Sequence, residues 1–542
     1  MTVRRLALMV LGLAAMAACG ALADDWRVFY GPQGFAAGTA AWLGDKTHSE
    51  RTADGLLVAD PSTEKGSGRT YWFDWRADPG RGAALEARAK VKSCSAPYGV
   101  HLGVADGVHE EALTLYPDRV ELENAKLKTP LNTTDRFHTY RLEIRGDDLS
   151  VFVDGQKTLE ARGKFTGPAY EKRNRCSFGG GSSAATGEAV WQEVRYRTGV
   201  EEARPVTVPQ VRGLKVAVGD EQTIVPGATY VSLFRFADGT LMVGDRRSKD
   251  GGRTWEQVKS GLGVGAFEFP DGEVISPGFN TKKLADGVFE VGMARSTDHG
   301  ELFRVEPARL NIPEGTGGTG DDGKYYEGPP VDHSIVQLRD GSLLMAMYGY
   351  FKTDTVPCPT FPPEWKVYKY RTWVMRSTDR GRTWDLRATV AYDPSIGTES
   401  FCEADLLPLP GGELLAFMRT GGSGGIMTPL YLSRSRDDGQ TWSKPEPIAD
   451  RGVWPNACRM GGSGVIACTY GRPDNWLCFS LDGGKTWVGH LCFYQGASSS
   501  YNSVEEVAPG KLLVVYDRTR VDAEGNMASV VVGRFVEVTG DR

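Results

Sequence analysis

Long helical periodicities are scarce in this sequence, and so is any excess of positive charge. Its 68 glycines and 29 prolines separate many short apolar runs, a composition that favours a mostly β protein. Sixty-three lysines and arginines stand against 69 aspartates and glutamates, a net charge of -6. This balance gives no reason to expect a nucleic acid partner.

The chain has little apolar sequence of membrane-spanning length. Its one candidate is at the N-terminus, where Arg4 and Arg5 precede an apolar stretch from Leu6 to Ala18. Ala21-Leu22-Ala23 then forms a small-x-small cleavage site, so residues 1–23 are predicted to be a signal peptide and the protein to be secreted or periplasmic. Two alternatives remain: an uncleaved N-terminal anchor, and a lipoprotein attached through Cys19.

Cysteine and histidine are also few, at nine and seven residues. Without Cys19, eight cysteines remain, an even number that permits disulfides in an exported protein. A bridge between Cys94 and Cys176 is expected to staple the N-terminal region, while the other pairings stay open. No cysteine has zinc-ligand spacing with a histidine, so neither a metal site nor a cofactor is expected.

Residues 25–200 show short segments in which apolar and polar residues alternate, as in a β-sandwich. The segments are 84–91, 140–145 and 149–155. The run from His138 to Gly155 resembles the concanavalin-like (laminin-G-like) jelly-roll domains attached to many secreted glycosidases. That resemblance implies either a carbohydrate-binding domain or a structural spacer. A Pro- and Val-rich stretch within 201–214 is interpreted as a linker.

The remainder, residues 215–540, contains an eight-residue repeat of the form Ser-x-Asp-x-Gly-x-Thr-Trp, whose second copy is degenerate. The five copies begin at Ser248, Ser296, Ser377, Ser435 and Ser480. The Asp is expected to accept bonds from its own turn, the Gly to take a positive φ, and the Trp to pack between sheets. This Asp-box (BNR) repeat resembles that of the sialidase superfamily. The resemblance implies an all-β fold, a six-bladed β-propeller preceded by the sandwich, and a structural role for the Asp-box itself.

Glycine-containing turns between apolar strands mark a second repeat, interpreted as the hairpins of the inner strands of each blade. Residues nine before and seven after each turn glycine should then face each other at one rim of the central channel. These pairs are Tyr230 with Arg246, Asp332 with Tyr348, Glu403 with Arg419, Asn456 with Arg472, and Tyr501 with Asp517. Charges that converge at one end of a propeller suit an anion-binding glycosidase better than a purely structural rim.

Three of these segments resemble sialidase blades in detail. Residues 403–419 resemble the blade that supplies the Glu of a Tyr/Glu pair and one carboxylate-binding arginine, which implies those roles for Glu403 and Arg419. Tyr470-Gly-Arg472-Pro resembles the segment with another such arginine, and residues 500–517 resemble the blade with the nucleophile, here Tyr501. A phenol suits an anionic sugar, which would repel a carboxylate nucleophile, but it needs a neighbouring base to take its proton.

Each of these residues also has a simpler interpretation. Tyr501 could only stack on a sugar, and Glu403 could be an ion-pair partner of its hairpin neighbour Arg419. Arg419 and Arg472 could be held in intramolecular ion pairs rather than bind a ligand. Tyr230 and Tyr348 are expected among the substrate-binding residues of the rim.

The sequence departs from the sialidase pattern in its first blade. The stretch 227–233 has no arginine, so Arg246 is the candidate replacement, although it could equally be a structural residue. The loop that usually carries the acid/base Asp is missing before Ser248, and Asp332 or His333 is expected to take that role.

These observations predict an exported exo-acting glycoside hydrolase, similar to exo-α-sialidases, that releases terminal sialic acid or a related acidic sugar from a glycan or glycoconjugate. Two alternatives stay open: a glycosidase or lyase for another polysaccharide on the same fold, and a glycan-binding propeller without catalysis.

Overall fold

The computed structural model describes residues 26–36, 40–43, 48–63, 68–75, 77–170, 173–180, 185–198, 206, 208–226, 232–423, 426–495, 498–521 and 527–540. The predicted signal peptide, Cys19 and residues 201–205 and 207 of the predicted linker lie outside these residues, as does Tyr230. The chain divides into two compact units, one of residues 1–33 and 44–202 and the other of 34–43 and 203–542. Both units consist of β-strands, and the regular helix described is the short 3-10 helix η2 (Pro363–Trp365).

The first unit contains two antiparallel sheets. One sheet has the order β14 (Gln156–Ala161), β13 (Asp148–Val153), β12 (His138–Arg145), β7 (Ala83–Cys94), β16 (Gly187–Thr198) and β1 (Arg27–Gly31), with β5 (Gly55–Asp60) and β4 (His48–Thr52) beside β16. The other has the order β11 (Leu127–Pro130), β10 (Arg119–Leu122), β9 (Glu110–Leu115), β8 (His101–Asp106), β15 (Asn174–Gly180) and β6 (Arg69–Phe73). The three alternating segments predicted in this region are indeed strands. The concanavalin-like assignment stays a prediction.

Aromatic side chains join the two sheets of this unit. Phe178 on β15 packs 5.0 Å from Trp191 on β16 and 5.2 Å from Phe29 on β1, measured between ring centroids. All three side chains are fully buried. The expected bridge between Cys94 and Cys176 is wrong, because all eight described cysteines are free thiols. Cys176 lies in the buried interior, whereas Cys94 ends β7 at a partly exposed position.

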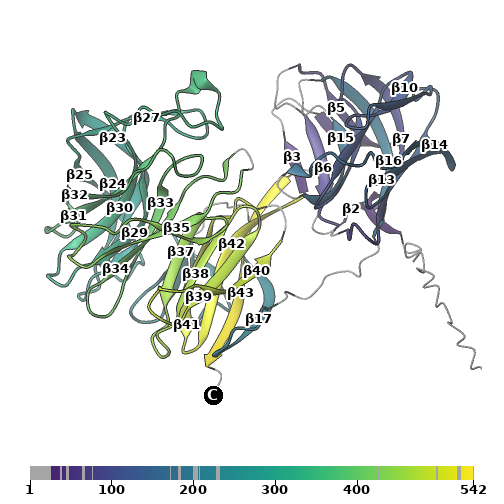
Figure 1. Ribbon diagram of the computed structural model, residues 1–542. Helices are drawn as coiled ribbons and strands as arrows, with labels where there is room; N and C mark the ends of the chain where they lie inside the picture. The colour runs from purple at the N-terminus through teal and green to yellow at the C-terminus, as the bar shows by residue number, and fades with distance from the viewer. Residues whose placement is uncertain are drawn as a thin grey trace, which may run out of the picture. The chain divides into compact units, whose positions relative to one another are not determined.

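The second unit contains six successive groups of four antiparallel strands (Figure 1). The second and third groups join in one nine-stranded sheet through a parallel pairing of their fourth strands. In chain order the six groups are β18 (Leu233–Arg235), β19 (Leu241–Val243), β20 (Arg246–Ser248) and β21 (Glu256–Gln257); β22 (Phe267–Glu268), β23 (Val274–Ala285), β24 (Val288–Ser296) and β25 (Arg304–Asn311); β29 (Val331–Gln337), β30 (Leu343–Phe351), β31 (Arg371–Ser377) and β32 (Thr383–Ala391); β33 (Cys402–Pro408), β34 (Leu414–Arg419), β35 (Leu430–Ser435) and β36 (Glu446–Ala449); β37 (Val453–Arg459), β38 (Ile466–Gly471), β39 (Asn475–Ser480) and β40 (Val488–Tyr494); and β41 (Asn502–Ala508), β42 (Lys511–Val521), β43 (Met527–Gly540) and β17 (Leu214–Pro226).

The last group joins the two ends of the repeating part of the chain, because β17 is the first strand of the six groups in the sequence and pairs with β43, which is the last. Short strands lie outside the groups: β26 (Gly315–Thr316), β27 (Gly318–Thr319) and β28 (Tyr325–Tyr326) between the second and third, and β2 (Gly34–Phe35) and β3 (Ala40–Leu43) in the early segment of the unit. The all-β structure is consistent with a β-propeller.

The Asp-box forms the tight turn that its sequence predicts. In the fourth copy the Ser435 hydroxyl donates to Asp437 at 2.8 Å, and the Thr441 N–H donates to the same carboxylate at 2.9 Å. The Trp442 indole N–H donates to the Gly439 carbonyl at 3.2 Å, and Gly439 has a φ of 78°. The bond from Ser to Asp recurs in all five copies at 2.6–2.9 Å. These donors hold the pKa of Asp437 down to about 2, Thr441 above all.

The predicted hairpin pairs are partly correct. Asn502 faces Tyr516, which is the register that the prediction of Tyr501 with Asp517 requires, although the ladder itself begins at Asn502. Val331 faces Met347 before a bulge, so the predicted pairing of Asp332 with Tyr348 is wrong. Arg419 faces Cys402 rather than Glu403, because a bulge shifts the register by one residue. Asn456 faces Thr469, so its predicted partner Arg472 is wrong. Arg246 begins the third strand of its group, β20, because the preceding strand ends at Val243.

Candidate active site

Tyr501 and Glu403 come together from two different groups of strands. The Tyr501 hydroxyl donates to Glu403 Oε1 at 3.0 Å. Tyr501 directly precedes β41 and is half-buried, whereas Glu403 lies in β33 and is 3% exposed. Burial raises the pKa of Glu403, and the charges of Arg419 and Arg472 lower it in part. Burial also raises the pKa of Tyr501 well above its usual value, and the charge of Glu403 adds to this.

Arg419 is enclosed by protein acceptors. Its Nη1 donates to Glu403 Oε1 at 2.6 Å, and its Nη2 lies 2.9 Å from Glu399 Oε2. Nη2 also donates to the Ser423 hydroxyl at 2.9 Å, and Nε donates to the Gly421 carbonyl at 2.7 Å. Only 1% of Arg419 is exposed. The guanidinium therefore forms a buried ion-pair network with two carboxylates of its own chain.

Trp454 holds the second oxygen of Glu403, and Trp454 and Arg472 both lie beside the Tyr501 ring. The Trp454 backbone N–H, on β37, donates to Glu403 Oε2 at 3.2 Å. The Trp454 ring lies 4.3 Å from the Tyr501 ring between centroids, and the Arg472 guanidinium lies 5.7 Å from the same Tyr501 centroid. Each Glu403 oxygen thus receives a donor from a different element, which holds the carboxylate in one orientation.

The backbone at these positions is locally irregular. Glu403 and Trp454 have φ values of 40° and 48°, and register shifts interrupt the ladders between Cys402 and Asp405 and between Val453 and Asn456. Non-glycine residues rarely adopt positive φ, and β-bulges commonly redirect side chains beside functional sites. The two bulges direct Glu403 and the Trp454 N–H toward each other.

Asp517 and Arg472 hold the segment that precedes Tyr501. Asp517 on β42 is 2% exposed and accepts from the hydroxyls of Ser498 and Ser499 at 3.0 and 2.7 Å. Arg472 donates from Nε and Nη2 to the Ser499 carbonyl at 3.3 and 2.7 Å. These contacts fix the position of the Tyr501 backbone.

The other predicted site residues lie at different depths. Tyr348 is half-buried and packs 5.3 Å from Tyr370 between ring centroids, and burial raises its pKa with a further contribution from the charge of Glu403. Asp332, on β29, is completely buried. The backbone of His333 lies in β29, but its side chain is outside the described residues, as is all of Tyr230. Arg246 Nε lies 3.5 Å from Asp245 Oδ1, within its own turn.

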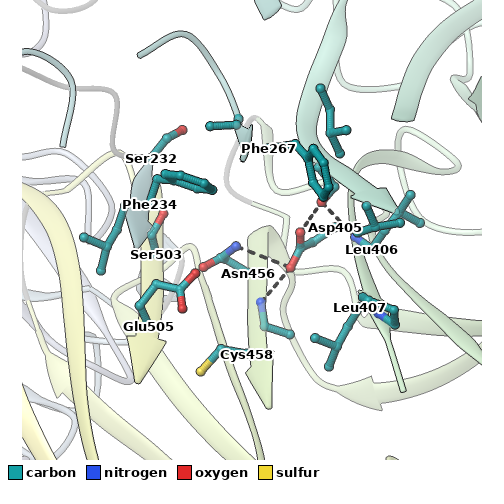
Figure 2. A pocket seen from close by; sticks show the side chains of 18 of the residues that line it. Ser232, Phe234, Phe267, Asp405, Leu406, Leu407, Asn456, Cys458, Ser503 and Glu505 are labelled. Carbon is teal, nitrogen blue, oxygen red and sulfur yellow. Dashed lines mark hydrogen bonds between the residues drawn. The ribbon is translucent and has the colours of Figure 1, made fainter. Parts of the chain in front are cut away.

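A cavity of about 580 Å³ lies further along the strands that carry Glu403, Trp454 and Asp332. Its lining comes from β22, β29, β33, β37, β41 and the start of β18, which are the first strands of their groups (Figure 2). Ser334, Asp405, Asn456 and Ser503 line it, each two residues beyond Asp332, Glu403, Trp454 and Tyr501 respectively. The candidate site and the cavity therefore share the inner strands of the unit.

Two carboxylates dominate the chemistry of this cavity. Asp405 accepts from the Ala457 N–H at 2.6 Å and from the Asn456 amide at 3.3 Å, as well as from the Ser334 hydroxyl (Figure 2). Burial raises the pKa of Asp405 to about 7. Burial and the charge of Asp405 raise the pKa of Glu505 to about 8.

Three residues of the candidate site were not predicted from the sequence: Glu399, Trp454 and Asp321. Glu399 precedes Glu403 by four residues, but it lies outside β33 and carries no repeat signal. Asp321 lies between β27 and β28, and its Oδ2 is 3.8 Å from Arg419 Nη2. The run from Gly315 to Gly323 is rich in glycine, but nothing in its sequence indicates which site it reaches.

Comparison with known protein families matches a repeat profile to part of the second unit. A profile of the BNR repeat-like domain matches residues 274–514. A sialidase of Bacteroides fragilis (strain YCH46) is 24% identical over 310 residues, which cover 51% of this chain and 54% of the relative. The chain thus spans about half the length of the curated relative it matches.

Solved structures that resemble the chain are distant. The NanB sialidase from Streptococcus pneumoniae shares 11% identity with a TM-score of 0.39, over 84% of this chain and 95% of its own. The GH93 α-L-arabinofuranosidase of Fusarium graminearum shares 15% identity with a TM-score of 0.43, over 58% of this chain and 97% of its own.

The repeat profile and the sialidase relative support a likeness of this chain to the sialidase-like superfamily and a glycoside hydrolase-type fold. Among the described residues, no helix has the length and apolar character needed to cross a membrane.

Proposed function

We propose that this protein is an exported, exo-acting glycoside hydrolase of the sialidase type, with Tyr501 as nucleophile and Glu403 as its base. The observation that carries the proposal is the 3.0 Å hydrogen bond from the Tyr501 hydroxyl to Glu403 Oε1. A buried carboxylate with a raised pKa is a stronger base than an exposed one, which suits proton removal from a phenol. The six four-stranded groups would be the blades of a propeller over 215–540, with a sandwich over 25–200, a linker over 201–214 and a signal peptide over 1–23.

Terminal sialic acid or a related acidic sugar is the first substrate to test. Arg472 would meet the substrate carboxylate through Nη1, since its bonds to the Ser499 carbonyl use Nε and Nη2. Tyr348, at the half-buried edge of the site, would contact the sugar.

The enclosure of Arg419 favours a second candidate, a glycosidase for a neutral sugar. Its guanidinium is directed at Glu399, Glu403, Ser423 and Gly421, so a substrate carboxylate would have to displace one of these partners. Two buried carboxylates beside one arginine also leave the site rich in negative charge, which disfavours an anionic ligand.

The test is hydrolysis of fluorogenic 4-methylumbelliferyl glycosides by wild type and Tyr501→Phe. The panel contains a sialoside and neutral pyranosides and furanosides, and Tyr431→Phe, on β35, is the matched control. Turnover of the sialoside that disappears only in Tyr501→Phe supports the first candidate, and the same pattern on a neutral glycoside supports the second. Glycan binding without turnover of any substrate would contradict both and leave a binding protein.

A further inference from the structure

Retaining hydrolysis needs a proton-transfer group besides the nucleophile and its base. The oxygen of the departing sugar must gain a proton, and the water that later attacks must lose one. Glu403 is already engaged with Tyr501, and Asp332 is completely buried. A group that meets the departing sugar must instead be accessible at the entrance of the site.

Asp321 meets this requirement. Its side chain is 45% exposed, whereas those of Glu399 and Glu403 are only 1% and 4% exposed. Its Oδ2 lies 3.8 Å from Arg419 Nη2, and its charge raises the pKa of both Tyr501 and Glu403. Asp321 therefore lies, partly exposed, beside the guanidinium that also pairs with Glu403.

A small hairpin holds Asp321 in this position. Gly318 faces Tyr326 and Thr319 faces Tyr325 in the β27–β28 ladder. The Tyr350 hydroxyl, on β30, donates to the Thr319 carbonyl at 2.7 Å. A Cβ on Gly318 would lie 2.3 Å from the Tyr350 ring, so only glycine allows this close approach. The hairpin is thus bound to β30, the strand that also carries Tyr348 of the candidate site.

We propose that Asp321 is the acid/base residue of the glycoside hydrolase, supplied by the β27–β28 hairpin in place of the loop missing before Ser248. This inference rests on the proposed function. In the first step the glycosidic C–O bond breaks and the departing oxygen takes the Asp321 proton. The Tyr501 oxygen bonds to the anomeric carbon, and the Tyr501 proton passes to Glu403. In the second step water adds to that carbon and gives a proton to Asp321, while Tyr501 leaves and recovers its proton from Glu403.

The adjacent Asp322 is the matched control. It accepts from the Tyr326 hydroxyl and the Lys324 N–H, both at 3.0 Å, and it lies 3.1 Å from Lys324 Nζ. Its carboxylate is therefore used within the hairpin, and Asp322→Asn changes the charge of the same turn without removing the proposed acid.

The experiment compares two substrates of the sugar that wild type releases: its 4-methylumbelliferyl glycoside and its unactivated disaccharide. A good leaving group departs without protonation, so Asp321→Asn should lower kcat/KM for the disaccharide by about 10²–10⁴-fold and much less for the first step on the aryl glycoside. Added azide should restore aryl-glycoside turnover in Asp321→Asn, because it replaces water without needing a base. Asp322→Asn should stay within about threefold of wild type on both substrates.

Two results would overturn this role: equal losses on both substrates with no azide effect, or an Asp322→Asn variant as impaired as Asp321→Asn. Failure of the proposed function has a different signature. In that case Tyr501→Phe would keep its activity, or wild type would turn over no glycoside at all, whichever residue occupies position 321.

Discussion

Tyr501 and Glu403 are 98 positions apart in the chain, yet the phenol of one donates to the carboxylate of the other at 3.0 Å. The same Glu403 oxygen receives the Arg419 Nη1 at 2.6 Å, and the other oxygen receives the Trp454 N–H at 3.2 Å. Glu403 is thus oriented by three different strand groups before any substrate arrives. Such preorganisation is what a base needs to take a proton as the nucleophile attacks.

The pH profile of kcat/KM should report Glu403. The base must be ionised, and burial raises the pKa of Glu403, so activity should fall as the pH falls through a midpoint above the ordinary glutamate value of about 4.3. Steady-state rates between pH 4 and 9 measure this acidic limb, and Asp322→Asn is the control. A limb at or below the ordinary carboxylate value would contradict the role of Glu403.

Removing Arg419 should cost more stability than removing Arg472. Arg419→Ala leaves Glu399 and Glu403 buried beside each other without their cation, at a cost of about 3–5 kcal/mol in the free energy of unfolding. Arg472→Ala removes bonds to a backbone carbonyl at a half-buried position and should cost about 1 kcal/mol. Urea denaturation of the two variants gives the comparison, and equal losses would show that the Arg419 network is not closed as described.

The third Asp-box should contribute stability but no catalysis. Asp379 accepts from the Ser377 hydroxyl at 2.8 Å and from the Thr383 N–H at 2.9 Å, so Asp379→Ala should lower the free energy of unfolding by about 1–3 kcal/mol. Arg382→Ala, at a variable position of the same turn, should change it by less than about 0.5 kcal/mol. Thermal unfolding and kcat are measured together, and a fall in kcat of the folded Asp379→Ala protein would argue against a structural role.

Glu505 should make stability depend on pH. Its folded pKa of about 8 lies above its ordinary value, so between roughly pH 4.5 and 8 the unfolded chain gives up this proton more readily than the folded one. The Glu505 contribution to stability therefore falls as the pH rises through this window and is constant above it. Glu505→Gln should flatten the decline in the unfolding midpoint between pH 5 and 8. An unchanged slope would mean that Glu505 is not desolvated in the cavity.

The Asp-box turns could be predicted because they depend on a local repeat, whereas the Tyr501–Glu403 pair was expected only from the resemblance to sialidase blades. The eight-residue motif defines its own hydrogen bonds, and the hairpin offset gave the register of the last hairpin, in which Asn502 faces Tyr516. The offset failed where the ladder is interrupted. A bulge separates Asn456 from Arg472, and the chain turns after Val243, which moves Arg246 to the next strand.

Asp321 and Glu399 could not be predicted for a different reason. Both lie outside the repeating strands, and their approach to Arg419 depends on how irregular segments pack across groups. From the sequence, an Arg419 held by carboxylates of its own chain was one of two interpretations, and the other was an Arg419 that binds a ligand. Residue spacing does not distinguish between them.

The central claim is that Tyr501 attacks the sugar, and peptide mapping of a trapped intermediate tests it most directly. Wild type is incubated with a fluorinated, activated glycoside of the sugar it releases, which slows hydrolysis of the covalent intermediate. Mass spectrometry should then find one added glycosyl group on the peptide that contains Tyr501, and none after the same treatment of Tyr501→Phe. A glycosyl group on Glu403 or Asp321, or turnover with inversion at the anomeric carbon, would contradict the account.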